Sequence, residues 1–170
     1  TAYMWRDILQ ADSLLDLLLH FIKRYDEGYE DRNTKEMKRR TVVIFPRYHQ
    51  LRAVHKLRRL VEEEGVGHNY LIQHSAGSGK TKTMAWLAHQ FTNMIDANGA
   101  AVFDSIIMVT DRIVLNRNMA EDVVNFETTL GTVMDIRKRS KTLADALNGK
   151  NRIIISTVQK FAYALDYLKH

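Results

Sequence analysis

Apolar and polar residues follow one another along the chain in blocks that predict strands and helices in turn. Nearly continuous apolar runs of strand length occur at 41–45, 105–109, 131–136 and 152–156, and another run ends at Ile72. The runs at 105–109 and 152–156 are typical of parallel strands that are buried on both faces. Apolar residues at helical spacing predict helices at 50–64, 80–94, 141–147 and from after Arg112 to about Phe126. Strands that alternate with helices predict an α/β fold with a parallel sheet and right-handed crossovers.

The first 40 residues predict a different kind of segment. Ser13, with Asp16 three residues later, is a typical helix start, and the residues from Leu14 to Ile22 are apolar almost without a break. A helix that is apolar on most sides needs partners on several faces, so we expect it to pack at a domain junction. The stretch 25–40 is polar and rich in charge, which predicts a loop or linker. We therefore expect a helical extension over 1–40 and the α/β domain over 41–170.

Charge and composition narrow the class of protein. The 170 residues carry a net charge of +5 and contain no cysteine, which excludes a disulfide framework and a thiolate metal site. No stretch resembles a signal peptide, and no apolar run approaches the length of a membrane span. These features predict a cytoplasmic protein without membrane contact.

Basic residues are concentrated in one part of the chain. Between Arg32 and Arg59 there are ten Lys and Arg against one acidic residue. In the predicted helix 50–64, Arg52, Lys56 and Arg59 fall on one face, opposite an apolar face. A basic block of this kind suits a polyanion such as DNA, RNA or a nucleotide, and it is equally typical of a solvated surface.

One small-residue loop has the pattern of a phosphate-binding loop. His-Ser-Ala-Gly-Ser-Gly-Lys-Thr at 74–81 follows the apolar run that ends at Ile72 and precedes the predicted helix 80–94. Small residues let successive backbone N–H groups point inward, and the helix N-terminus adds partial positive charge there. Lys80 would reach the β- and γ-phosphates, and the Thr81 hydroxyl would ligate Mg²⁺. The pattern departs from G-x-x-x-x-G-K-[ST] at its first glycine, where this chain has His74.

Three polar clusters follow predicted strands directly, at 75–81, 110–112 and 156–160. Ligands of open parallel sheets gather at the carboxyl ends of the strands. The sequence therefore predicts that these clusters line one functional edge. Gln50 begins the helix that precedes the phosphate loop, and its amide can pair with N6 and N7 of adenine. A helix-capping or surface glutamine is the alternative for this residue.

The motifs together resemble a known family. Phe-Pro-Arg-Tyr-His-Gln at 45–50 is similar to the adenine-reading Q motif of superfamily 2 helicases, and 74–81 to their motif I. Val-Thr-Asp-Arg at 109–112 resembles motif Ia, and Ser-Thr-Val-Gln-Lys-Phe at 156–161 resembles the strand-end motif shortly before motif II. In this order and wording, and with Asp-Ser-Leu-Leu-Asp at 12–16, the motifs resemble the R subunit of type I restriction endonucleases.

This resemblance implies a RecA-like P-loop lobe of a motor that translocates double-stranded DNA using ATP and Mg²⁺. The implied partners are the methyltransferase (M) and specificity (S) subunits of the same complex. Lys80 and Thr81 would be catalytic, with Thr81 as the Mg²⁺ ligand. The implied nucleotide-binding residues are Arg47, Gln50, Ser75, Ala76, Gly77, Ser78, Gly79, Lys80 and Thr81. The implied DNA-binding residues are Thr110, Arg112, Thr157 and Gln159.

Other parts of such a motor are not in this sequence. No Asp-Glu-x-His pattern follows Lys160, and neither a second lobe nor a nuclease cluster is present. We therefore expect the linker and the first half of the first motor lobe, with no nuclease activity and little ATPase on its own. Two alternatives are open: another P-loop ATPase or a small-molecule kinase, and a non-catalytic module that binds DNA or docks to a subunit.

Overall fold

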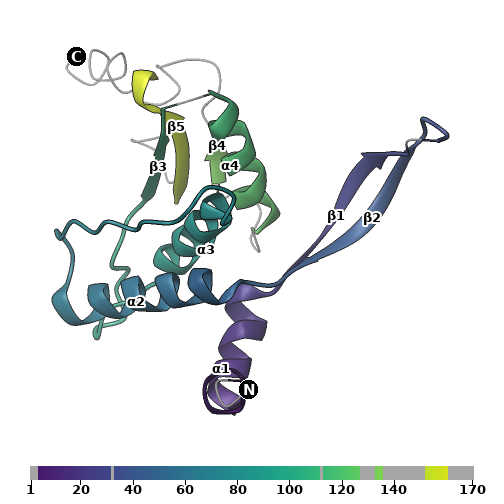
Figure 1. The fold of residues 1–170 in the computed structure, drawn as a ribbon. Coiled ribbons are helices and arrows are strands. Elements are labelled where there is room, and N and C mark those ends of the chain that lie inside the picture. Colours follow the sequence, from purple (N-terminus) through teal and green to yellow (C-terminus); the bar gives the residue numbers. More distant parts are fainter. Residues whose placement is uncertain (1–3, 32, 112, 127–132, 136–151, 161–170) are drawn as a thin grey trace. The chain divides into compact units, whose positions relative to one another are not determined.

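The computed structural model describes residues 4–31, 33–111, 113–126, 133–135 and 152–160 (Figure 1). The chain separates into two compact units, Thr1–Leu51 and Arg52–His170, and each is described by itself.

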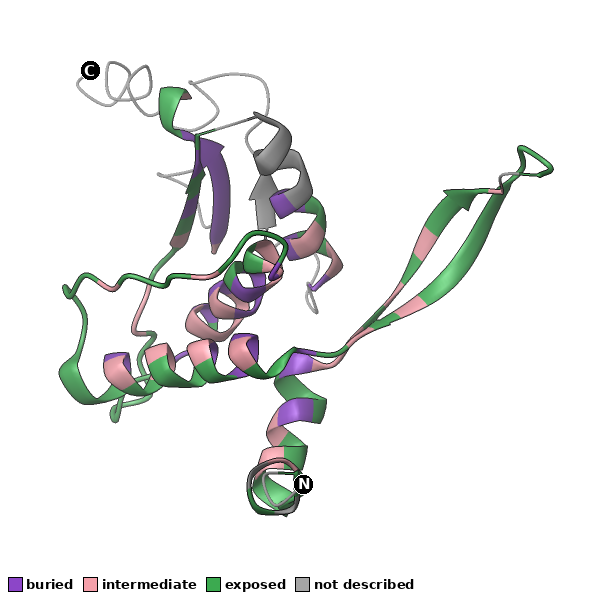
Figure 2. Ribbon diagram, viewed as in Figure 1, coloured by how far each residue is buried: buried purple, intermediate pink, exposed green. Residues whose placement is uncertain are grey.

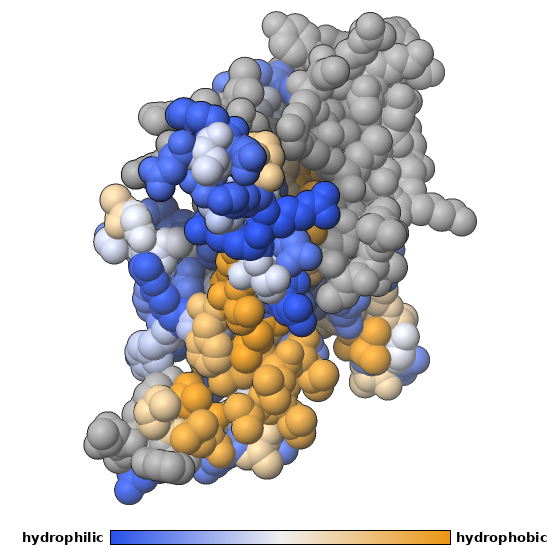
Figure 3. All heavy atoms as spheres, turned by 90° about the vertical axis from the view of Figure 1, so that its right-hand side faces the viewer, coloured by the Kyte–Doolittle hydropathy of each residue, from blue (hydrophilic) through white to orange (hydrophobic). Residues whose placement is uncertain are grey.

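The first unit starts with a helical segment and continues into a hairpin. The segment comprises π-helical turns at Met4–Ile8 and Leu17–Phe21 around α1 (Ala11–Asp16), which confirms the predicted apolar helix. Leu17 and Phe21 are buried. Other apolar side chains of the segment are exposed: Met4, Leu9, Leu14, Leu15, Leu18 and Leu19. The face drawn in Figure 3 has a broad apolar area.

The loop prediction for 25–40 was wrong. β1 (Lys23–Glu30) and β2 (Met37–Ile44) pair as an antiparallel hairpin, with Lys23 opposite Ile44 and Glu30 opposite Met37. The ladder is supported by polar cross-strand pairs rather than by apolar alternation. Arg40 contacts Glu27 at 2.8 Å, and the Thr41 hydroxyl donates to Asp26 at 2.8 Å. Cross-strand pairs of this kind stabilise a sheet without leaving an apolar period in the sequence.

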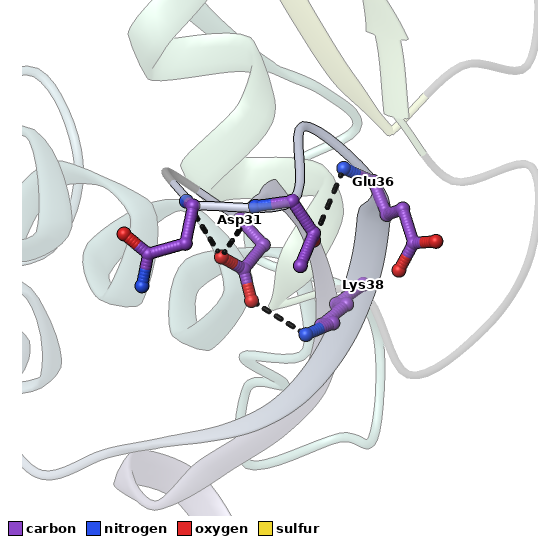
Figure 4. Close-up of polar contacts among 5 residues, drawn as sticks. Asp31, Glu36 and Lys38 are labelled. Carbon is purple, nitrogen blue, oxygen red and sulfur yellow. Dashed lines mark hydrogen bonds and ion pairs between the residues drawn. The ribbon is translucent and has the colours of Figure 1, made fainter.

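A carboxylate organises the tip of this hairpin (Figure 4). Asp31 accepts hydrogen bonds from the backbone N–H groups of Asn33 at 2.9 Å and Thr34 at 3.4 Å, and from the Lys38 amino group at 2.5 Å. These contacts lower the pKa of Asp31 below its ordinary value. The Lys38 hydrogen bond is the largest cause, and the two backbone donors follow.

The second unit is built on a small parallel sheet. Its order is β3–β5–β4, comprising β3 (Ile106–Thr110), β5 (Ile153–Thr157) and β4 (Val133–Asp135). All five residues of the central strand β5 are buried, as expected for a strand with neighbours on both edges (Figure 2). The strands predicted at 105–109, 131–136 and 152–156 are confirmed, and with them the α/β class with a parallel sheet. The strand predicted at 41–45 forms as the second half of β2, in the antiparallel hairpin and not in this sheet.

Two helices pack together beside this sheet, α3 (Lys80–Thr92) and α4 (Ile113–Asn125). The rings of Trp86 and Phe126 lie 5.1 Å apart, and both side chains are buried. The Lys82 amino group contacts Asp122 at 2.6 Å, and a ring nitrogen of His89 lies 2.8 Å from the Val123 carbonyl oxygen. Both predicted helices are confirmed within two residues at their C-terminal ends. The predicted helix 141–147 lies outside the described residues.

Helix α2 (Tyr48–Glu64) begins two residues before its predicted start and ends where the sequence predicts, after three glutamates. Ion pairs one turn apart stabilise this last part, Arg58–Glu62 at 3.0 Å and Arg59–Glu63 at 3.6 Å. The helix ends at Gly65, whose φ of 79° is left-handed and whose N–H donates to the Val61 carbonyl.

The predicted strand before the phosphate loop does not form. Residues 65–79 contain no strand, and Leu71 is 94% exposed. A strand needs a neighbour for its backbone hydrogen bonds, and within the described residues this run has none. The short apolar run is therefore not sufficient to make a strand in this structure.

Candidate functional site

The loop between residue 74 and α3 is shaped by two glycines. Gly77 has a φ of 71° and Gly79 a φ of 83°, both left-handed. Residues with a side chain are strained at these values, so glycine is required by the backbone at both positions. The second of these turns leads directly into α3 at Lys80, as the sequence predicts.

The side chain of Lys80 folds back over this loop. Its amino group donates to the carbonyl oxygens of Ser75 at 2.9 Å and His74 at 3.3 Å. The loop therefore curves around a positive charge that is already held close to its backbone. These acceptors are backbone atoms, so no side-chain pattern in the sequence could have identified them.

The start of α3 has no side-chain cap. Gly79 occupies the cap position and offers no side chain, and no other side chain closes this helix start. The first N–H groups of an α-helix lack partners within the helix, and together with the helix dipole they favour an anion. This helix start can therefore receive a phosphate group.

The remaining predicted phosphate-loop residues surround this helix start. Ser75 and Ala76 are exposed, whereas Ser78 is buried and its N–H lies 3.4 Å from the Ser75 carbonyl oxygen. Thr81 is half-buried in the first turn of α3. A hydroxyl at this position suits a hard cation such as Mg²⁺, which prefers oxygen ligands. Within the described part of the chain, no group of three or more His, Cys, Asp or Glu forms a separate metal cluster.

Gln50 lies in the first unit and takes a capping position. Its side-chain oxygen accepts the Arg47 backbone N–H at 2.8 Å, while its own N–H donates to the Arg47 carbonyl at 2.9 Å. This is one of the two bonds of a capping box, in which the side chain of the third helical residue accepts the backbone N–H of the cap residue. The side chain is buried at 3% exposure. The capping role considered from the sequence is thus present.

The two predicted strand-end clusters meet at one edge of the sheet. Thr110 and Thr157 are register partners on β3 and β5, and the Gln159 amide donates to the Asp111 carbonyl at 3.1 Å. Thr110 and Thr157 are buried, whereas Gln159 is exposed. Arg112 lies outside the described residues.

One contact between α3 and α4 left no sequence signal. The Lys82–Asp122 ion pair joins the first turn of α3 to α4 across 40 residues of sequence. Neither residue belongs to a motif, and long-range pairs of this kind cannot be found from local spacing.

An α/β unit with a parallel sheet and a glycine loop before a helix has an arrangement that commonly binds phosphate groups in proteins. Residues 49–169 match the family model of the SWI2/SNF2 ATPase, which covers more than half of the chain. The chain belongs to the SWI2/SNF2 ATPase family.

The chain is also similar to a curated protein. The chain is 28% identical over 171 residues to the "Putative type I restriction enzyme MjaVIIP endonuclease subunit" of Methanocaldococcus jannaschii. The match covers 92% of this chain and 15% of the relative's length. No solved structure matches the chain. None of the helices in the described part combines the length and apolarity that a bilayer crossing requires.

Proposed function

We propose that residues 75–81 bind the phosphates of ATP together with Mg²⁺, and that the chain is the ATP-binding part of a DNA-translocating motor. The observation that carries this proposal is the position of Lys80. Its amino group lies against the loop carbonyls, beside two left-handed glycines and an uncapped helix start. The family match to an ATPase gives independent support.

Each residue has a distinct role in this proposal. The Lys80 amino group turns from the loop carbonyls to the phosphate oxygens, and the loop N–H groups between Ser75 and Gly79 bind the same phosphates. The Thr81 hydroxyl holds Mg²⁺, which when bound neutralises phosphate charge. Lys80 and Thr81 are therefore the catalytic residues of this chain. We propose a RecA-like lobe over 41–170, with 1–40 as the extension that joins it to a neighbouring domain.

Base recognition is assigned to Gln50, with Arg47 beside it. Adenine pairing needs a donor to N7 and an acceptor from N6, and an amide provides both. In the structure the amide oxygen of Gln50 accepts the Arg47 N–H, so reading adenine would add to this cap or replace it.

In the complete protein, the motor would translocate double-stranded DNA and support cleavage within a cytoplasmic type I restriction complex. Thr110, Arg112, Thr157 and Gln159 would contact the DNA backbone, and the M and S subunits would be the partners. The relative named as a type I restriction enzyme subunit supports this proposal. The expected readout is that double-stranded DNA stimulates ATP hydrolysis by the complete protein.

The first test is a calorimetric titration with Mg-ATP of the wild-type chain, Lys80→Ala and Lys82→Ala. Losing a charged hydrogen-bond donor costs about 1.5–3 kcal/mol, so Lys80→Ala should weaken binding roughly 10- to 100-fold. Lys82→Ala is the matched control, because it removes a lysine from the same helical turn whose amino group is paired with Asp122. Equal affinity of Lys80→Ala and the wild type, or no binding by the folded wild type, would contradict the proposal.

A further inference from the structure

Helix α2 carries a row of exposed cations, and other residues of the same helix are buried. Val54 and Val61 are buried at 0% and 7% exposure. Arg52, Lys56 and Arg59 are exposed, and we call these three residues the α2 stripe. Figure 2 shows the helix with exposed residues along one side and buried or intermediate residues along the other. At 1.5 Å per residue, the stripe is about 10 Å long.

The order of charges along α2 is unfavourable with respect to the helix dipole. Cations are stabilising near a helix C-terminus and acids near the N-terminus. In α2 the first turn contains no acid. The last turn contains no base, and the helix ends in three glutamates, Glu62–Glu64. The pairs Arg58–Glu62 and Arg59–Glu63 also run in the less favourable direction, with the base before the acid. The helix dipole therefore does not favour the position of the stripe, although the Arg59–Glu63 pair still contributes to the stability of the last turns.

The composition of the exposed side points to a polyanion rather than to a protein surface. Between residues 52 and 59 every exposed residue is Arg, Lys or His, and none is apolar. Protein interfaces are depleted in Lys and depend on buried aromatic or apolar anchors. Double-stranded DNA presents one negative charge per 1.7 Å of its axis, and guanidinium groups bind phosphate in a bidentate manner.

We propose that the α2 stripe binds the phosphate backbone of double-stranded DNA, as a contact separate from the strand-end residues 110–112 and 157–159. This inference rests on the proposed function, since that function supplies DNA as the polyanion. The contact is independent of sequence, because it reaches phosphates and not base edges. It would hold the duplex during translocation while the nucleotide changes at the phosphate loop.

The test compares two triple variants that lose the same charge. The stripe variant carries Arg52→Gln, Lys56→Gln and Arg59→Gln. Glutamine removes each charge and keeps a high helix propensity. The control variant carries Arg24→Gln, Lys35→Gln and Arg39→Gln, which remove three exposed cations from the β1–β2 hairpin. Binding to a short duplex of mixed sequence is measured by fluorescence anisotropy over a series of salt concentrations. Circular dichroism and thermal unfolding confirm that each variant is folded.

The stripe variant should bind at least about tenfold more weakly, and its slope of log K against log salt should fall by about 2 to 3, at roughly 0.9 per phosphate contact. The control variant should lower that slope by less than about 1. Equal losses in both variants, an unchanged slope in the stripe variant, or no DNA binding by the wild type would overturn the inference.

Mg-ATP titration of the same proteins separates the two proposals. Both triple variants should bind Mg-ATP like the wild type, because the stripe lies outside the phosphate loop. Suppose that Lys80→Ala loses ATP binding, while the stripe variant keeps the salt slope of DNA binding. That result would refute this inference and leave the proposed function standing. A lower slope in a chain that binds no Mg-ATP would refute the proposed function instead.

Discussion

The hairpin tip and the start of α2 are closed in a different way from the loop before α3. In the first unit, side chains satisfy the backbone: Gln50 caps the start of α2, and Asp31 closes the hairpin tip. In the second unit, the loop before α3 uses left-handed Gly77 and Gly79 and places no side-chain cap on the helix.

This contrast has a chemical consequence. A side-chain cap gives an internal acceptor to the N–H group that it binds, which at α2 is the Arg47 N–H, so that group is not offered to an anion. An uncapped helix start keeps that capacity for an anion from outside. The absence of a cap is tolerable at α3 because packing against α4 holds the body of the helix.

The largest expected effect comes from removing that packing. Phe126→Ala deletes a buried ring that lies against Trp86, and such a change costs about 3–5 kcal/mol of unfolding free energy. Chemical denaturation followed by tryptophan fluorescence measures the loss. Val124→Ala, at an exposed position on the same helix, should change stability by less than about 0.5 kcal/mol. Equal losses in both variants would show that α3 does not depend on this packing.

The next effect concerns the glycine geometry of the loop. Gly79→Ala puts a side chain at a φ of 83° and should cost about 1–2 kcal/mol of stability. It should also weaken Mg-ATP binding about tenfold or more, equivalent to 1.4 kcal/mol. Gly99→Ala is the control, because Gly99 has a φ of 80° at a turn outside the loop. The comparison fails if Gly99→Ala weakens nucleotide binding as much as Gly79→Ala does.

A smaller effect separates the two roles of Gln50. Gln50→Ala removes the cap on the Arg47 N–H and should cost about 1 kcal/mol of stability. Gln50→Glu retains an acceptor for that N–H and places an acid in the first turn, so stability should be kept. A carboxylate cannot donate to N7, so both variants should lose a preference for ATP over GTP in titrations. A Gln50→Glu variant that still prefers ATP would refute the adenine-reading role.

The smallest effect is a pH dependence of the hairpin tip. The pKa of Asp31 is lowered in the folded chain, so its contribution to stability is present above the unfolded pKa. It is lost as pH falls through the lower folded pKa. Titration of the Asp31 carboxyl by NMR should give a pKa below the ordinary value for aspartate. Lys38→Gln removes the main cause and should raise that pKa, and an unchanged pKa would exclude Lys38 as the cause.

The sequence predicted the elements whose signal is local. β3 and β5 were readable because their residues are continuously apolar, and α3 because a glycine precedes a helical pattern. The β1–β2 hairpin was not readable, because its ladder is supported by pairs such as Arg40–Glu27 that lie far apart in the sequence. Leu71 shows the opposite failure, since an apolar run predicted a strand where the structure has no partner for one.

The candidate site was predictable in its motif and not in its contacts. The spacing of Gly77, Gly79 and Lys80 identified the loop, but the backbone acceptors of Lys80 are invisible in a sequence. Gln50 was open to two interpretations because capping and base reading favour the same residue type at a helix start. The structure establishes the cap, and adenine reading stays a prediction.

The contacts of Lys80 have a consequence for which anions the loop accepts. Its amino group already has two acceptors, so an arriving ligand exchanges acceptors instead of supplying the first one. The gain is the difference between a phosphate oxygen and a neutral carbonyl, less the cost of returning two carbonyls to water. Weakly charged ligands gain little from such an exchange, whereas a triphosphate gains the most. The loop would therefore select its ligand by charge density before it tests the shape of the base.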